Sequence, residues 1–358
     1  MTDLDQALER FQLADFEYGE GLSNHGPMAA EALVALGHSA LVTGLVHSYA
    51  ARLPDLRRGT PMDEAEQAAA LGCRERLPDW LATYEARLEG RKWRDLLREA
   101  LPRLVPGLAG AATHGLLRTA HAVRALEAEE TPARRRELAF GLAYWAGCYE
   151  GLPGHPGARP QAGRGPAEVL EGIVPLPLER RGGLLLSGAM RRLVDEPLFV
   201  ASIESVDLSC ADPGAFLSAL CASAAGLYLE NLHARIAYVH AVTGPSALRL
   251  VAPYLAEADL RRGLGAALQV AAALHAVSAR VPGAPGQEVT IENPDMEIEK
   301  VSENVDEIRY RAACSLQEHA IKFAEACLRE DAIAPDARLR LAAAEAAVRL
   351  TAPGWGKW

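Results

Sequence analysis

The sequence is poor in lysine, in aromatic residues and in long apolar runs. Only four of its 37 basic residues are lysines, and aromatic residues make up 6% of the chain. The longest mainly apolar stretch, residues 29–53, is interrupted by Glu31, His38 and His47, so it is too polar to cross a bilayer unaided. Acidic residues open the chain, where a signal segment needs basic and then apolar ones. These absences predict a cytoplasmic protein that does not enter membranes.

Cysteine and the common short motifs are also scarce. The six cysteines lie far apart without a C-x-x-C pair, which argues against a zinc knuckle or disulfide framework and predicts reduced, buried thiols such as Cys314 and Cys327. The chain has no H-E-x-x-H, no Glu-x-x-His pair, no P-loop, no G-x-G-x-x-G after a strand and no G-x-S-x-G. Common zinc, di-iron, nucleotide and serine-hydrolase sites are therefore not indicated.

The charge is acidic and the apolar content is ordinary. A net charge of -10 argues against nucleic acid and anionic membranes as partners, because both require basic patches. Apolar residues make up 49% of the 358 residues, and the mean hydropathy is near zero. The chain is therefore long and apolar enough to bury a substantial core.

The sequence pattern predicts helices over most of the chain. Apolar residues recur at three- and four-residue steps, alanine and leucine are abundant, and alternating strand patterns are absent. We predict an all-α protein with a single large, bundle-like helical domain over residues 1–358. Long loops are expected near 151–165 and 281–307, and short irregular or strand-like pieces near 174–197. The expected helices cover roughly 1–12, the residues from Pro27 onward, 63–87, 90–103, 108–129, 132–149, 213–242, 244–279, 303–330 and 334–351.

The helix expected at 213–242 carries few charges, which predicts that it is buried. His233 and His240 would lie two turns apart on one side of it, and Thr243-Gly244-Pro245 would end it. Polar groups in a core must be hydrogen-bonded or ligated. We therefore expect this helix to line a site, with His240 either as a ligand or as a satisfied core residue.

Other histidines lie in settings that allow two interpretations. His25 stands directly before Gly26 and Pro27 at an expected helix start, and taken alone it is a residue of the turn. His114, Arg118 and His121 share one helix face at positions i, i+4 and i+7. Such a face is usually solvated. The alternative is a polar face turned toward an internal cavity.

Lys322 follows His319 by three residues, at the border of an apolar stripe in the helix expected at 303–330. A lysine in this position usually extends its amine to water. If it is buried, desolvation lowers its pKa and favours the neutral amine. A neutral amine can add CO2 and become a carbamate, an anionic oxygen ligand that arginine cannot form.

At these residues the sequence resembles the questin oxidase-like family. The fungal members of this family act on anthraquinones and related polyketides, by Baeyer–Villiger-type or dioxygenase ring cleavage. The resemblance rests on five short blocks in the same order along the chain. They are residues 24–28, 113–118, 144–154, 240–243 and 319–322.

The resemblance implies a non-haem Fe(II) site with O2 as co-substrate. It implies four histidine ligands and one lysine carrying a CO2-derived carbamate, namely His25, His114, His240, His319 and Lys322. Four neutral imidazoles and one carbamate leave one octahedral position open, although zinc or copper could occupy such a site too. It also implies a set of catalytic or substrate-orienting residues near the metal. These are Asn24, Arg118, His121 and His233.

The activity expected from the resemblance is O2-dependent C–C cleavage, which opens a ring of a polycyclic aromatic substrate in secondary metabolism. One alternative is a metal-independent or NADPH-dependent Baeyer–Villiger-type monooxygenase on similar substrates, although the sequence contains no nicotinamide-binding motif. A further alternative is a non-enzymatic helical binding protein whose histidines are hydrogen-bonded core residues.

Overall fold

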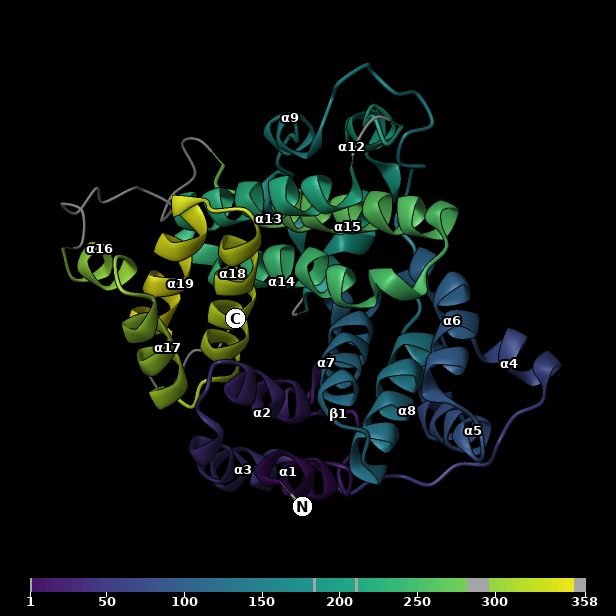
Figure 1. Cartoon of the computed structure of the whole chain (residues 1–358). Coiled ribbons are helices and arrows are strands. Elements are labelled where there is room, and N and C mark those ends of the chain that lie inside the picture. The colour runs from purple at the N-terminus through teal and green to yellow at the C-terminus, as the bar shows by residue number, and fades with distance from the viewer. Residues whose placement is uncertain (1, 183–184, 210–211, 282–295, 351–358) are drawn as a thin grey trace. The chain divides into compact units, whose positions relative to one another are not determined.

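The computed structural model describes residues 2–182, 185–209, 212–281 and 296–350. Within them the chain forms nineteen α-helices and several short 3-10 turns (Figure 1). The strands found there are one antiparallel pair of two residues each, β1 (Glu17–Tyr18) and β2 (Leu22–Ser23). The predicted all-α class is confirmed. The described part of the segment 174–197 holds short helices in place of strand-like pieces, namely α10 (Leu178–Arg181) and α11 (Leu186–Met190).

The chain divides into two compact units. Unit 1 comprises Met1–Gly151 and Ala247–Gly263, and unit 2 comprises Leu152–Ser246 and Leu264–Trp358. The division falls inside two helices, α14 (Arg235–Val251) and α15 (Glu257–Ser278), so both units contain residues of each. The expectation of a single domain over the whole chain stays a prediction.

Unit 1 is built on the packing of α7 (His114–Ala128) against α8 (Pro132–Gly147). Glycine permits this close approach, because a Cβ at Gly115 would lie 2.4 Å from the Cα of Trp145. Helix α2 (Gly26–Ala35) packs on α7, and α5 (Leu77–Leu88) packs on α8. The other α-helices that lie wholly in this unit are α1 (Asp3–Phe11), α3 (Val42–Tyr49), α4 (Glu64–Ala70) and α6 (Trp93–Leu104).

Unit 2 is organised around α19 (Ala337–Arg349), which packs against α18 (Glu318–Ile333) and α13 (Pro213–Glu230). Residues 151–165 contain no helix or strand, as predicted. The loop predicted near 281–307 is wrong from residue 296 onward, where α16 and α17 form, and residues 282–295 lie outside the described residues. The remaining α-helices of this unit are α9 (Pro166–Glu171), α12 (Pro197–Glu204), α16 (Met296–Ser302) and α17 (Val305–Cys314).

The helix predicted at 213–242 is wrong in its extent. Helix α13 ends at Glu230, and Asn231 caps it by donating from its side-chain amide to the Leu227 carbonyl at 2.9 Å. His233 lies in the following 3-10 turn, so it does not share a helix with His240. Helix α14 then continues through Pro245. A proline inside a helix removes one hydrogen bond, and the buried apolar residues on both sides of Pro245 outweigh that loss.

The helix predicted at 303–330 is also broken. Leu316 adopts a left-handed conformation with φ +49, which ends α17 and separates it from α18. The side-chain oxygen of Gln317 accepts the backbone N–H groups of His319 and Ala320 and so starts α18. Cys314, predicted to be buried, is exposed because α17 ends there, whereas the five described cysteines are all free as expected.

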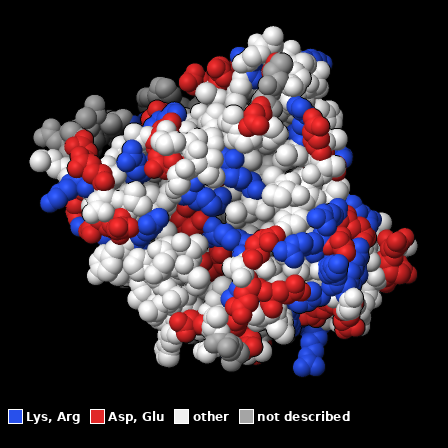
Figure 2. All heavy atoms as spheres, in the orientation of Figure 1, with Lys and Arg blue, Asp and Glu red and all other residues white. Residues whose placement is uncertain are grey.

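The face drawn in Figure 2 carries acidic and basic side chains intermixed, with arginines beside aspartates and glutamates. Exposed pairs of this kind, such as Arg87 with Glu99 and Arg309 with Asp306, each contribute less than about 1 kcal/mol to stability. Among the described helices, none is by itself long and apolar enough to cross a membrane. Helix α13 and the segment Leu232–Tyr254, bent from it by 104°, meet the same criterion only as a pair.

Candidate functional site

His25 and His114 face each other in unit 1. His25 directly precedes α2 and His114 begins α7. Their Nε2 atoms are 2.7 Å apart, their rings stack with centroids at 4.6 Å, and both side chains are buried. Two imidazoles bound to one octahedral ion at about 2.1 Å would have adjacent nitrogens about 3 Å apart. The two residues that the first two blocks predicted as ligands therefore lie together, close to the geometry of a shared ion.

A left-handed turn orients His114. The three residues before it, Ala111, Ala112 and Thr113, have φ of +48, +51 and +72, a conformation that costs a non-glycine residue about 1–2 kcal/mol. The Ala111 carbonyl oxygen lies 2.5 Å from Nδ1 of His114. Because a carbonyl can only accept, Nδ1 carries the proton, and Nε2 of the neutral ring keeps the lone pair that a metal requires.

His240 and His319 form a second pair, in unit 2. His240 is buried on α14, His319 lies in the first turn of α18, and the two rings are perpendicular with centroids 5.9 Å apart. The Gln317 amide, fixed by the backbone N–H groups that its oxygen accepts, donates to Nδ1 of His319 at 3.2 Å. In this arrangement neutral His319 carries its proton on Nε2. Ligation through Nε2 therefore requires this hydrogen bond to break.

Lys322 is buried on α18, with 2% of its surface exposed. No described residue accepts a hydrogen bond from its amine. Burial lowers the pKa of Lys322 from 10.5 to about 7, against the opposing charge of Glu318. The interpretation of a lysine that extends to water is therefore wrong, and the neutral amine is well populated near neutral pH.

Glu318 is a candidate that the sequence reasoning missed. It lies one turn before Lys322 on α18, is buried, and has a carboxylate oxygen 4.0 Å from Nδ1 of His319. Glu318 directly precedes His319, so the two residues do not form the Glu-x-x-His pair of di-iron sites. Its i, i+4 spacing from Lys322 was the available signal. It supplies a carboxylate, which is an oxygen ligand that iron accepts.

Arg118 is buried in unit 1, so the interpretation of a solvated face on α7 is wrong. The face is covered because α2 and α8 both pack against α7. The Arg118 guanidinium donates to both carboxylate oxygens of Glu137, at 2.6 and 3.1 Å, and lies 4.6 Å from the ring centroid of Phe140. Arg118 is thus held in a paired, stacked position, and it lines a small cavity with Nη1 buried and without a described acceptor.

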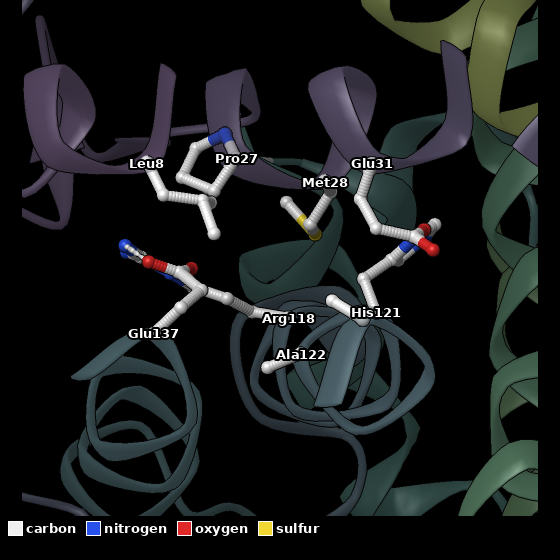
Figure 3. Close-up of a pocket in the computed structure, with 9 residues that line it drawn as sticks. Leu8, Pro27, Met28, Glu31, Arg118, His121, Ala122 and Glu137 are labelled. Atoms are coloured by element: carbon white, nitrogen blue, oxygen red, sulfur yellow. Dashed lines mark hydrogen bonds and ion pairs between the residues drawn. The ribbon is translucent and has the colours of Figure 1, made fainter. Parts of the chain in front are cut away.

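His121 is oriented by a carboxylate. Its Nδ1 lies 2.6 Å from Glu31, and Arg124 donates to both oxygens of Glu31. Burial raises the pKa of Glu31, but Arg124 and His121 outweigh burial and hold this pKa below its usual range. Figure 3 shows Glu31 and His121 on one side of a small cavity, with Glu137 on the other. The cavity has a volume of about 10 Å³, enough for about one water molecule. The cluster can hold or pass a proton.

The other two predicted residues have structural contacts. The Asn24 side chain accepts from the Gly26 N–H at 3.1 Å and donates to the Asp15 carbonyl at 3.3 Å, which fixes the turn that presents His25. His233, in unit 2, donates from Nε2 to the Ser278 carbonyl at 3.1 Å. Unit 2 also pairs the Tyr238 hydroxyl with Nδ1 of His275 at 2.8 Å, and His275 belongs to none of the sequence blocks.

No family model and no curated protein matches this chain. The resemblance to the questin oxidase-like family therefore stays a prediction.

Proposed function

We propose that this chain is a non-haem iron-dependent dioxygenase of the questin oxidase-like kind, which uses O2 to open a ring of a polycyclic aromatic substrate. The observation that carries the proposal is the burial of Lys322 without a described hydrogen-bond partner. A buried, unpaired ammonium group is unfavourable, so the site favours the neutral amine from which a carbamate forms.

The ligand types in this proposal suit Fe(II). The proposed ligands are two histidine pairs, His25 with His114 and His240 with His319, together with carboxylated Lys322. The lysine nitrogen would form a bond to the carbon of CO2 and lose one proton, which gives a carbamate without any oxidation or reduction. Imidazole nitrogens and an anionic oxygen are ligand types that iron accepts. Glu318 is the alternative source of that oxygen.

The remaining residues would handle protons and orientation. When bound, Fe(II) would offer an open coordination position that activates O2, and the electron-rich ring of the substrate would supply the electrons that reduce it. His121, held by ionised Glu31, would act as the base that takes a proton from a phenol. Asn24 and the Ala111 carbonyl would hold His25 and His114 in place.

The test is elemental analysis of protein purified without added metal and without a histidine tag. We expect near-stoichiometric iron in the wild-type protein, and loss of iron after alanine substitution of any of the four histidine ligands or after Lys322→Met. His155→Ala, which changes an exposed histidine, is the control and should keep its iron. Retention of iron in a ligand variant would remove that residue from the set. A folded wild-type protein that neither contains iron nor takes up added Fe(II) would contradict the proposal.

A metal-independent oxygenase is a second candidate, and the Glu31–His121 pair favours it, because an oriented imidazole can ionise a phenol without a metal. Protein treated with a chelator that still consumes O2 with a quinol substrate, with or without NADPH, would support this candidate over the iron enzyme. Absence of both iron and turnover, together with tight binding of an aromatic compound, would favour a binding protein.

A further inference from the structure

Two arginines of unit 2 have buried N–H groups that no described residue accepts. Arg181 ends α10, and its Nε donates to the Leu176 carbonyl at 2.8 Å, but its Nη2 has no acceptor. Arg280 follows α15, and its backbone N–H donates to the side chain of Asn231 at 2.9 Å, but its Nε has no acceptor. A buried donor of this kind is costly unless something accepts its hydrogen bond.

Backbone contacts bring these arginines to the same end of α15. The Leu176 N–H donates to the Ala276 carbonyl at 2.8 Å, so the segment that leads to Arg181 lies against the last turn of this helix. His233 donates to the Ser278 carbonyl, the last of the helix, and Arg280 follows two residues later. The C-terminal end of α15 is thus surrounded by basic side chains.

Positive charge predominates in this cluster, although the carboxylate of Glu230 also acts on Tyr238, the hydrogen-bond partner of His275. Burial and the charge of Arg181 lower the pKa of His275 to about 4, so this imidazole is neutral at physiological pH. Burial, Arg280 and Arg181 lower the pKa of His233, against its hydrogen bond to Ser278. The chain has 47 acidic residues, yet among the described residues no carboxylate forms an ion pair with Arg181 or Arg280. Among the described residues, neither guanidinium is therefore neutralised by a direct ion pair.

Arginines near a helix C-terminus often bind the last carbonyl groups, but that explanation does not account for these two. Arg181 donates to Leu176, which lies outside α15, and among the described contacts the Arg280 side chain donates to no carbonyl of this helix. We propose that the cluster is an oxyanion-binding site, in which Arg181 Nη2 and Arg280 Nε hold a carboxylate or phosphate group. Guanidinium groups bind both by charge-assisted hydrogen bonds. The proposal does not depend on iron.

The test titrates the full chain with two probes, benzoate and inorganic phosphate, by calorimetry. We expect saturable binding of at least one probe, and binding at least about tenfold weaker in Arg181→Gln and in Arg280→Gln. Arg338→Gln, which changes an exposed arginine paired with Asp336, is the matched control and should bind as the wild type does. In NMR titrations the bound anion should raise the pKa of His233 and His275, because it offsets the guanidinium charges.

Each outcome decides the proposal. Binding of benzoate alone identifies a carboxylate site, binding of phosphate alone a phosphate site, and binding of both a general oxyanion site. No binding to the wild type, or equal binding in both arginine variants, would overturn the proposal. If these variants do not fold, the wild-type histidine titration decides, and histidine pKa values that neither probe changes would overturn it. Iron is not measured here, so a failure of this proposal is distinct from a failure of the iron site.

Discussion

Helices α7 and α18 each bury one long basic side chain, but only the side chain on α7 is paired with a carboxylate. Arg118 on α7 is paired through two hydrogen bonds with Glu137 and stacks on Phe140. Lys322 on α18 is buried to the same degree but has no described acceptor for its amine. Guanidinium cannot give up its proton in a protein, so it must be paired when buried, whereas an amine can become neutral.

This difference distinguishes a charged group that stabilises helix packing from one that is available for binding or reaction. The Arg118–Glu137 pair fixes α7 against α8 and neutralises the guanidinium charge, although Nη1 of Arg118 is buried without a described acceptor. The Lys322 amine is unsatisfied and has a pKa shifted by burial, which is typical of groups that react or bind.

Arg118→Met should lower the free energy of unfolding by about 3–5 kcal/mol, because it leaves the buried carboxylate of Glu137 without its cation. Urea unfolding followed by circular dichroism measures this change. The double variant Arg118→Met, Glu137→Met should recover most of the loss. Arg309→Met, in an exposed pair, should change stability by less than about 0.5 kcal/mol. Similar losses in the single and double variants would show that the pair is not the source of the effect.

Lys322→Met should change the free energy of unfolding in the opposite direction to Arg118→Met. In metal-free protein at pH 7 it should raise the free energy of unfolding by about 1–2 kcal/mol, because it replaces an unsatisfied buried amine with an apolar side chain of similar length. Iron content, measured on protein purified in parallel, should fall to background. If Lys322→Met destabilises the protein and leaves its iron content unchanged, Lys322 is neither an unsatisfied buried group nor a metal ligand.

The pH dependence of stability should reveal the same lysine. Its pKa is about 7 in the folded chain and 10.5 in the reference state, so the unfolded chain binds more protons between these values. The stability of metal-free wild type should therefore rise with pH in this window, by up to about 1.4 kcal/mol per pH unit, and the lysine should contribute nothing further above 10.5. Urea unfolding at pH 7, 8 and 9 checks this, with Lys322→Met as the reference. Parallel pH profiles for the two proteins would contradict the shifted pKa.

His121→Ala should be milder for iron than His114→Ala. His121 is hydrogen-bonded to Glu31, which Arg124 also pairs, so its loss should cost about 1 kcal/mol of stability and leave the iron in place. His114→Ala should remove the iron, because it deletes a proposed ligand. Elemental analysis of the two variants side by side decides between these roles. Equal loss of iron in both would assign His121 to the ligands.

Ala112→Gly should give the smallest change, a gain of up to about 1 kcal/mol in the free energy of unfolding. Glycine adopts the positive φ of this position without the steric cost that alanine has. Ala120→Gly, in the middle of α7, is the matched control and should instead destabilise the protein by about 1 kcal/mol. A loss at both positions would show that the left-handed turn is not strained.

The helical class and the positions of several helices could be predicted from the local pattern of apolar residues. Helices α1, α8 and α19 lie close to their predicted positions, because each has its own start signal and a regular apolar stripe. The helix breaks at Asn231 and Leu316 could not be predicted from this pattern. Asn231 is held by the Leu227 carbonyl and by the Arg280 N–H, and Arg280 lies 49 residues further along the chain. A capping contact with so distant a residue leaves no local signal.

Some residues of the candidate site could likewise be predicted from the sequence, and others could not. The blocks predicted four histidines as ligands of one iron ion. In the structure His25 lies beside His114 in unit 1, and His240 lies beside His319 in unit 2. The blocks did not predict that Glu318 would be buried beside Lys322, nor that the Gln317 amide would hold Nδ1 of His319. Glu31 and Glu137 were also missed, since a glutamate on a helix is usually a solvated residue and only its neighbours show otherwise.

The sequence by itself determined the helical class, the apolar content of the core and the residue types available for chemistry, because these follow from composition and from the 3.6-residue period. Only the tertiary structure decided which charges are paired. Arg118 and Lys322 look alike in the sequence, because each is a basic residue within a helix of mixed apolar and charged residues. Glu137 reaches Arg118 from another helix, no described side chain does the same for Lys322, and a pKa depends on such neighbours and on burial.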